Sequence, residues 1–380
     1  MAPRGLPEPV LIRGTGLLGT SIGLGLRAAG ADVYLADPSP SAQAVAEDIG
    51  AGRPYPGDLT GTPGQEPAGA GTPPGTVVVA SPPDVTGQVV IDSLLRFPGA
   101  VVLDIASVKG QVQRQVQAAV VDGTLTGAQG ALYVGTHPMA GRERSGPVAA
   151  RGQLFTAAPW VVCAGEDSAP EAVAAAEEVA RTLGATVHRM DAADHDASVA
   201  LISHLPQIAA SLVSSRLQET PAASLALSGN GLRDTTRIAA SDPQLWVQIL
   251  AANAPDILQI LYGVRQDLDR LIATMEDPSA PGARLDIAQL MAEGNAGHAR
   301  IPGKHGAPPQ AFAVVTVIVD DTPGQISAVL QDVGTAGVNV EDLRMDHSAG
   351  YEVGMLEISV LAGRKQELTD ALSAQGWKVV

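Results

Sequence analysis

The first 165 residues alternate short, uninterrupted apolar runs with longer stretches that carry apolar residues at helical spacing. The runs are rich in Val, Leu and Ile and lack the hydrophobic–polar alternation of a strand with one wet face. Such runs are typical of parallel strands covered by helices on both sides of a sheet. We therefore expect a doubly wound parallel sheet with strands at 9–14, 32–37, 76–81, 100–107 and 131–137.

From about residue 166 to 295 the pattern becomes mostly helical. Pro206 interrupts this pattern, and because proline has no N–H, the carbonyl of Ile202 loses its helical donor. A kink is therefore expected beside His204. Three apolar-periodic helical segments are expected, at 169–184, 194–218 and 241–275.

The last 70 residues, 311–380, have a rhythm of their own. Four strand-like runs enclose two helical segments in the order βαββαβ, which predicts a compact α+β module. The expected strands are 311–320, 339–346, 351–361 and 377–380.

The sequence GTGLLG at 14–19 has the glycine spacing of dinucleotide-binding domains. It follows a predicted strand and precedes a helix of small residues. Gly14 allows the tight turn, Gly16 lets the backbone approach a pyrophosphate, and Gly19 permits close packing of helix on strand. The phosphates then face the free N–H groups of the helix, and Leu17 is expected as a further cofactor contact.

Asp37 ends the second predicted strand. Its carboxylate would accept hydrogen bonds from the adenosine ribose hydroxyls and would repel a 2′-phosphate. We therefore expect NAD rather than NADP, although the hydroxyl of Ser39 could help to hold a phosphate.

The chain of 380 residues is long enough for several domains, each with its own core. We expect a Rossmann-like domain at 8–165, a helical substrate and dimerisation domain at 166–295, a linker at 296–310 and an α+β domain at 311–380. A Gly/Pro-rich stretch at 52–75 reads as a surface loop without function. The long apolar helices have too few partners within one chain, which favours a homodimer.

Charge argues against two classes of partner. The chain has 24 Lys and Arg against 40 Asp and Glu, and no basic stripe, so nucleic acid and anionic membrane are not expected. We find no signal peptide and no apolar run near the roughly 20 residues of a membrane span, so a soluble cytoplasmic protein is expected. Cys163 is the only cysteine and is expected to be buried and inert.

Ligands of an open parallel sheet bind outside the carboxyl ends of its strands. Three polar residues follow predicted strands there: Ser81, Ser107 and His137. Pro138 biases His137 to an extended backbone. Oxidation of an alcohol by NAD needs a base for the hydroxyl proton, and histidine titrates in the right range. His137 is thus a candidate base, and a turn residue that faces water is the alternative.

Five segments occur in order and together resemble the prephenate/arogenate dehydrogenase family of tyrosine biosynthesis. They are GTGLLGTS, DIASVKG, GTHPMAGRERSG, ISHLPQ and LRDTTRIAASDPQLW. The resemblance covers about residues 9–295. The C-terminal module, with DDTPGQ after its first strand and GVNVEDL before the second, resembles an ACT domain, a class that commonly binds amino acids and regulates the attached enzyme.

The resemblance implies that NAD⁺ accepts a hydride from prephenate while the ring carboxylate leaves as CO₂, which yields 4-hydroxyphenylpyruvate. His137 would take the proton of the ring hydroxyl, and Ser107 would hold that hydroxyl or the histidine in line. Because aromatisation and loss of CO₂ supply driving force, no metal is expected.

The resemblance also implies three substrate contacts in the helical region, Arg237, His204 and Trp246, and helical spacing adds Arg233. Arg237 would grip a carboxylate, and Arg233, one helical turn earlier, is a second anion-binding candidate. His204 matches a substrate-contacting histidine, and Trp246 matches a residue near the active site. The structural alternatives are an ion pair of Arg237 with Asp234, a core histidine at 204 and core packing of Trp246.

His195 lies nine residues before His204. On one continuous α-helix that spacing is about half a revolution, so we do not expect His195 and His204 both to face one substrate unless the kink intervenes, and we expect His195 to be a helix-start residue.

In the ACT-like module we expect Asp321, Gly324 and Asn339 to bind an amino-acid effector, tyrosine in the first instance. Arogenate and 4-amino-4-deoxyprephenate stay open as substrates. More distant alternatives are a β-hydroxyacid dehydrogenase and a non-catalytic amino-acid sensor on a dehydrogenase scaffold.

Overall fold

The computed structural model describes residues 5–61, 63, 72–140, 146–302, 312–347 and 353–380. Parts of the predicted loop at 52–75 and of the predicted linker at 296–310 lie outside these ranges. The chain separates into two compact units, Met1–Val264 and Arg265–Val380.

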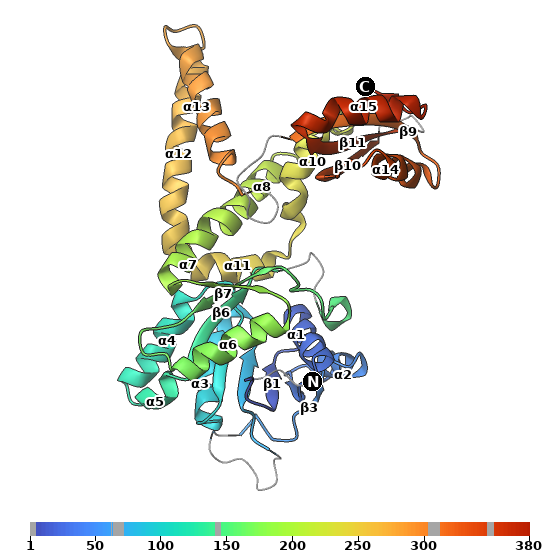
Figure 1. The fold of residues 1–380 in the computed structure, drawn as a ribbon. Coiled ribbons are helices and arrows are strands. Elements are labelled where there is room, and N and C mark those ends of the chain that lie inside the picture. Colours follow the sequence, from blue (N-terminus) through green and yellow to red (C-terminus); the bar gives the residue numbers. More distant parts are fainter. Residues whose placement is uncertain (1–4, 62, 64–71, 141–145, 303–311, 348–352) are drawn as a thin grey trace. The chain divides into compact units, whose positions relative to one another are not determined.

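An eight-stranded sheet is the centre of the first unit (Figure 1). Its strands are β1 (Val10–Arg13), β2 (Val33–Ala36), β3 (Arg53–Pro54), β4 (Thr76–Val79), β5 (Val101–Asp104), β6 (Tyr133–Pro138), β7 (Pro159–Cys163) and β8 (Thr186–Arg189). They lie in the order β3-β2-β1-β4-β5-β6-β7-β8. The first six are parallel and have the strand order of a dinucleotide-binding sheet, which confirms the predicted doubly wound architecture.

Helices cover both faces of this sheet because successive side chains of a strand point to opposite sides. Val10 and Ile12 of β1 pack in one apolar cluster, and Leu11 between them packs in the other. The helices over the first cluster are α1 (Leu17–Ala28), α2 (Pro40–Asp48) and α6 (Pro170–Thr182). Those over the second are α3 (Pro83–Arg96) and α4 (Gly110–Val121), and two short turns, α5 (Gly127–Gly130) and η1 (Pro147–Ala149), complete the set.

The sheet continues past residue 165, where we expect the nucleotide-binding domain to end. β7 runs antiparallel to β6, and α6 then carries the chain to β8, which is parallel to β7. The region from 166 therefore begins with a helix and a strand of the sheet, and the run of helices starts only at residue 192.

The following helices of the first unit are α7 (Ala192–Val199), α8 (Leu205–Ser215), α9 (Ala222–Leu225), α10 (Asn230–Thr236), η3 (Arg237–Ala240), α11 (Pro243–Ala252) and α12 (Ala254–Glu276), which continues into the second unit. A π-helical turn, η2 (Ala200–His204), joins α7 to α8. The disturbance expected beside Pro206 is thus a wide turn of the helix, with the proline in the first turn of α8.

Among the described residues, one helical run, Ala192–Ser215, has the length and the mean hydropathy (1.4) of a membrane-spanning helix. It also carries His195, Asp196 and His204, all buried by protein contacts. For a single helix, length and composition alone are weak evidence of a membrane span.

The second unit contains α13 (Ala283–His298) and a module of β9 (Phe312–Asp320), α14 (Gln325–Thr335), β10 (Asp342–His347), β11 (Val353–Leu361), η5 (Ala362–Arg364), α15 (Lys365–Ala374) and β12 (Lys378–Val379). The strands form an antiparallel sheet in the order β10-β11-β9-β12. Val317, Leu356 and Ile358 of the sheet pack with Val329 and Leu368 of the two helices. The predicted βαββαβ module is confirmed.

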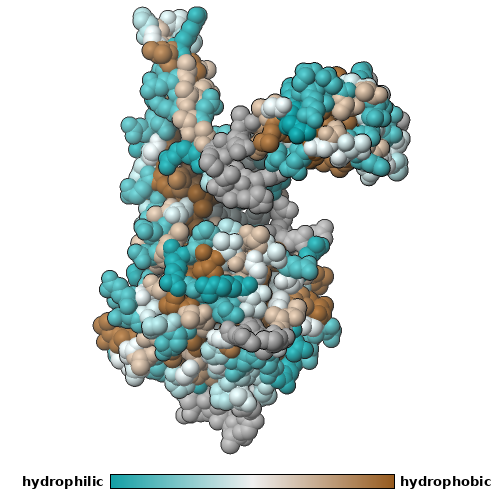
Figure 2. Space-filling view, in the orientation of Figure 1, coloured by the Kyte–Doolittle hydropathy of each residue, from teal (hydrophilic) through white to brown (hydrophobic). Residues whose placement is uncertain are grey.

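Apolar side chains stay exposed on the hairpin of α12 and α13, where Figure 2 shows brown atoms among teal ones. The exposed residues of the second unit there are Leu268, Ile272, Met275, Leu285 and Met291.

Substituting Gly19→Ala should destabilise the sheet unit. A Cβ at Gly19 would collide with the carbonyl oxygen of Gly14 and lie 2.9 Å from the Ala80 Cβ, so α1 must move off the strand. We expect a loss of about 1–3 kcal/mol, seen as a melting temperature several degrees lower. The matched control is Gly16→Ala, where nothing lies within 4 Å of the new Cβ. Equal melting temperatures for the two variants would contradict the close-packing argument.

Candidate active site

The glycine-rich loop joins β1 to α1 with the expected geometry. Gly14 has φ +113°, a conformation that favours glycine, and Gly16 begins α1 with no side chain capping the helix. The backbone N–H groups of this helix start are thus not covered by a cap side chain. Leu17 is the first residue of α1, half-buried, and Gly19 is buried against the loop.

Asp37 holds this loop in shape. Its carboxylate accepts hydrogen bonds from the backbone N–H of Thr15 (2.6 Å), the Thr15 hydroxyl (3.0 Å) and the backbone N–H of Ser39 (2.7 Å). It remains half-buried at the end of β2. The acidic group therefore has a structural function in addition to the expected contact with a ribose.

His137 lies at the carboxyl end of β6, opposite Val161 of the antiparallel strand β7. The residue as a whole is half-buried. The Nδ1 atom is 2.9 Å from the Nε2 atom of His195, and the two rings meet edge to face with centroids 5.1 Å apart. Burial, followed by the nearby His195, Lys109 and His204, holds the pKa of His137 well below its usual value of 6.5.

His195 connects His137 to a buried carboxylate. It is fully buried, and its Nδ1 atom is 2.8 Å from Oδ1 of Asp196. The same carboxylate accepts the backbone N–H groups of Lys109 and Gly110, each at 2.8 Å. Burial alone would raise the pKa of Asp196, but the hydrogen bonds from His195 and from these two N–H groups outweigh it and hold that pKa below its usual value.

The sequence analysis expected His195 as a helix-start residue and did not predict its contact with His137. His195 does lie near the start of α7, but it faces the site through its contact with His137. The helical-wheel estimate assumed 3.6 residues per turn throughout, whereas the π-helical turn Ala200–His204 has more residues per turn and changes the relative orientation of His195 and His204.

His204 lies on the far side of the same cluster and is buried. Asn253 donates through Nδ2 to the Asp196 carbonyl (2.8 Å), and this Nδ2 atom is also 3.2 Å from His204 Nδ1. The Trp246 ring meets the His204 ring edge to face at 6.0 Å. Burial lowers the pKa of His204 to about 4, so the ring is neutral at physiological pH.

A buried ion pair lies next to the histidine cluster. The Lys109 ammonium pairs with Oδ1 of Asp104, whose Oδ2 accepts the Tyr133 hydroxyl at 2.7 Å. Burial and then Asp104 raise the pKa of Tyr133 well above its usual value, so its hydroxyl stays a donor. Loss of one partner of such a buried pair typically costs about 3–5 kcal/mol.

Of the other predicted site residues, two serines lie at strand ends of the sheet and two arginines lie on exposed helices. Ser81 follows β4 and contacts the Thr86 hydroxyl at 3.2 Å, and half-buried Ser107 follows β5, the strand next to β6. Arg233 and Arg237 are exposed on α10 and η3, and the contacts that join the histidine cluster do not include them. The sequence reasoning missed Asp196, Lys109 and Asn253; the adjacent His-Asp pair at 195–196 was the available signal.

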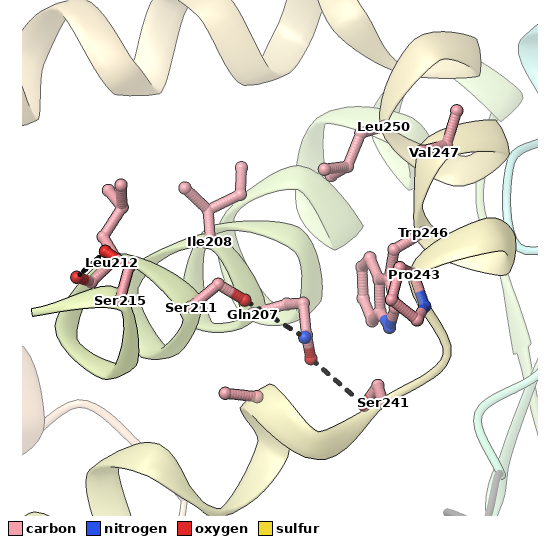
Figure 3. Close-up of a pocket in the computed structure, with 11 residues that line it drawn as sticks. Gln207, Ile208, Ser211, Leu212, Ser215, Ser241, Pro243, Trp246, Val247 and Leu250 are labelled. Carbon is pink, nitrogen blue, oxygen red and sulfur yellow. Dashed lines mark hydrogen bonds between the residues drawn. The ribbon is translucent and has the colours of Figure 1, made fainter. Parts of the chain in front are cut away.

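A groove of about 390 Å³ adjoins this cluster through Trp246 (Figure 3). Gln207 and Ser241 are hydrogen-bonded across its floor at 3.4 Å. The remaining lining is mostly apolar and carries no charged side chain: Ile208, Ser211, Leu212, Ser215, Ala239, Pro243, Val247 and Leu250. The groove has the size of a ligand site but does not by itself neutralise an anion.

In the part of the chain that the structure describes, no group of three His, Cys, Asp or Glu side chains could hold a metal ion. Cys163 is buried as predicted, and burial raises the pKa of its thiol to about 12, which disfavours the reactive thiolate.

Comparisons with known proteins agree with this architecture. Residues 22–189 match the nucleotide-binding domain of prephenate dehydrogenase, and residues 191–292 match the dimerization domain of the same enzyme. A probable prephenate dehydrogenase of Streptomyces niveus, NovF, is 34% identical over 377 residues, 97% of this chain and 98% of the relative. The chain belongs to the prephenate dehydrogenase family.

Other family members are more distant. Prephenate dehydrogenase of Bacillus subtilis is 29% identical over 60% of this chain and 61% of the relative. A crystal structure of prephenate dehydrogenase from Aquifex aeolicus with hydroxyphenyl propionate and NAD⁺ has a TM-score of 0.62 at 23% identity, covering 76% of this chain and 97% of that one. Arogenate dehydrogenase of Synechocystis has a TM-score of 0.56 at 25% identity, covering 76% and 99%.

Family membership makes this chain an NAD-dependent oxidoreductase with a nucleotide-binding domain followed by a helical dimerisation domain. The match to the nucleotide-binding domain begins at residue 22, after the glycine loop. The assignment of residues 14–19 as a dinucleotide-binding loop therefore rests on the local geometry, in which the loop joins strand β1 to helix α1.

The lowered pKa of His204 should make stability depend on pH. The folded protein binds no proton at this ring until about pH 4, whereas the unfolded chain binds one below about 6.5, so stability is lost as pH falls through that window. We expect the free energy of unfolding of the wild type to fall by about 2–3 kcal/mol more than that of His204→Gln between pH 7 and pH 4. The exposed-histidine control, His298→Gln, should follow the wild type. Parallel curves for the wild type and His204→Gln would contradict the assignment.

Proposed function

We propose that this member of the prephenate dehydrogenase family catalyses the NAD⁺-dependent oxidative decarboxylation of prephenate, with His137 as the base. The observation that carries the proposal is the position of His137. This half-buried residue lies at the carboxyl end of β6, two strands from β4 and three from the glycine loop after β1. This is the edge at which ligands of such sheets bind.

In the proposed reaction the ring hydroxyl of prephenate loses its proton to His137 while the carbinol hydrogen leaves as hydride to NAD⁺. The bond to the ring carboxylate then breaks, CO₂ departs, and its electron pair completes the aromatic ring of 4-hydroxyphenylpyruvate. A neutral histidine is the required starting state, and burial holds His137 in it at neutral pH. Ser107, at the neighbouring strand end, is proposed to hold the hydroxyl in line.

The substrate is a dicarboxylate, so a second part of the proposal concerns charge. Arg237 and Arg233 are proposed to bind a substrate carboxylate, since a guanidinium makes two parallel charge-assisted hydrogen bonds with it. His204, neutral and buried next to Trp246, is proposed to line the site as a polar, uncharged wall.

The cofactor proposal is NAD, bound by Gly14, Gly16, Leu17 and Gly19, with Ser81 at the next strand end. Asp37 supports NAD over NADP because its carboxylate faces the loop and would meet a 2′-phosphate with like charge.

We propose prephenate as the substrate, ahead of arogenate and 4-amino-4-deoxyprephenate. The relative that matches nearly the whole chain, NovF, is described as a probable prephenate dehydrogenase. The three substrates differ at the side-chain amine or the ring substituent. Direct comparison of their rates separates them.

A homodimer is proposed for the assembly. Exposed apolar side chains lie along the helices of the region that matches the dimerization domain, among them Leu201, Ile202, Leu212, Leu258 and Tyr262. Such faces are normally covered by a second subunit. Light scattering at micromolar concentration distinguishes the dimer from a monomer. A cytoplasmic location stays a prediction.

The βαββαβ module is proposed to be an ACT domain that binds an aromatic amino acid. Gly324 precedes α14 with φ +94°; Asp321 is exposed in the turn before this helix, and Asn339 is exposed in the segment after it. Asn339 at present donates to Glu341 at 2.7 Å, a contact that an effector would have to replace.

The test of the catalytic proposal is His137→Asn. Asparagine keeps a hydrogen-bonding group but takes no proton, so we expect kcat with prephenate and NAD⁺ to fall about 10²–10⁴-fold while KM changes little. Since the pKa of His137 lies below 6.5, the acid limb of wild-type kcat/KM should fall below pH 6.5. The control is His188→Asn on exposed β8. Parallel assays with arogenate and with NADP⁺ rank the substrates and the cofactors. Retained turnover in His137→Asn would refute the assignment of His137 as the base.

The test of the effector proposal uses the full chain. Tyrosine should lower kcat/KM of the wild type and lose its effect in Asp321→Ala and Asn339→Ala, whose basal activity should be unchanged because both residues lie outside the first unit. The control is Asp370→Ala, exposed on α15. Inhibition that is equally strong in all four proteins would place the tyrosine site elsewhere.

A further inference from the structure

We infer that Asp196 and His195 form a relay that fixes the tautomer of His137 and receives the proton that His137 gains. In this relay His195 and Asp196 are positioning residues, because neither touches substrate or cofactor. The inference rests on the proposed function of His137 as the base and adds how a half-buried ring that is held neutral can fill that function.

The relay begins at a carboxylate whose protonation state is determined by its donors. Asp196 accepts the backbone N–H groups of Lys109 and Gly110 at the start of α4, one on each oxygen. Two fixed donors and a helix N-terminus favour the ionised form. Asp196 is therefore an acceptor only, and the group that faces its Oδ1 atom must be a donor.

That donor is His195, with Nδ1 at 2.8 Å from Asp196 Oδ1. The proton of a neutral His195 therefore sits on Nδ1, and Nε2 carries a lone pair. Nε2 is 2.9 Å from Nδ1 of His137, so His137 must donate from Nδ1. A neutral His137 that has its proton on Nδ1 has a bare Nε2, which is the atom left to accept a proton from a substrate.

The opposite arrangement is disfavoured by the surroundings. It would place Nε2–H on His195 and a bare Nδ1 against the Asp196 carboxylate, two acceptors at hydrogen-bond distance. Only an imidazolium at His195 avoids this clash, and that charge would lie fully buried in the resting enzyme. The other ionisable groups around the pair are the Lys109 ammonium, paired with Asp104, and Tyr133 and His204, which bring no further negative charge.

The relay also explains how a half-buried histidine with a lowered pKa accepts a proton. Burial disfavours a positive charge on His137, which on its own would make it a weak base. When Nε2 of His137 takes the substrate proton, the Nδ1–H bond of His137 can break and a bond from that proton to Nε2 of His195 form. One proton enters and one moves inward, so the charge ends on His195, beside the Asp196 carboxylate.

Two substitutions separate tautomer control from proton transfer. In His195→Gln the amide oxygen can still accept from His137 Nδ1, so the tautomer is kept, but no proton can be received. In His195→Phe neither is possible. We expect kcat with prephenate to fall roughly tenfold in His195→Gln and at least about 10²-fold in His195→Phe, with KM nearly unchanged in both.

The direct readout is the ¹⁵N–¹H correlation of histidine rings at neutral pH, which distinguishes Nδ1–H from Nε2–H rings and needs no turnover. The chain has seven histidines, and His137→Asn identifies the signal of interest. We expect His137 as the Nδ1–H form in the wild type and His195→Gln, and as the Nε2–H form in His195→Phe. His188→Gln, exposed on β8, is the control for both measurements.

The outcomes are distinct. A wild-type His137 with its proton on Nε2 overturns the relay, and so does an unchanged kcat in His195→Phe. An unchanged kcat in His195→Gln overturns the inward proton transfer. If His137→Asn is inactive while both His195 variants are fully active, the assignment of His137 as the base is supported and the relay is refuted. If the wild type does not oxidise prephenate, the proposed function falls, and the ring spectra still decide the tautomer.

Discussion

The site depends on the hydrogen bonds that the Asp196 carboxylate accepts. This carboxylate accepts two backbone N–H groups at the start of α4 and the ring of His195, so it ties α7 to the turn that follows β5. A buried carboxylate without such donors would cost several kcal/mol, and this cost keeps α7 against the sheet. His195 is hydrogen-bonded to this carboxylate and also contacts His137. The same carboxylate therefore orients the His137 ring through His195.

The geometry of a parallel sheet brings the remaining groups together. β1, β4, β5 and β6 run in the same direction, so the glycine loop, Ser81, Ser107 and His137 all emerge at one edge. The strand order therefore places the glycine loop and His137, the proposed base, at the same edge, and the helical region adds neutral, buried groups such as His204 and Asn253. Polar groups in this cluster are paired with one another, as their burial requires.

Much of the fold was predictable because it rests on local patterns. Uninterrupted runs of Val, Leu and Ile marked the central strands, and the βαββαβ order of the C-terminal module was visible in its alternating segments. β8 was missed because TVHR at its position is short and polar, and its only strand partner is β7. The function of His195 was missed because a helical wheel assumes constant rotation, and the π-helical turn after it breaks that assumption.

The sequence by itself determined the class of protein: strand runs, glycine spacing and a histidine held by a proline specify a dinucleotide sheet with a candidate base at its edge, since each signal lies within a few residues. Only the tertiary structure decided which groups control that base. Asp196 and His195 lie 59 and 58 residues from His137 in the chain, and their hydrogen bonds exist only once α7 packs on the end of the sheet. A contact between distant segments has no local pattern, because it depends on where the rest of the chain places them.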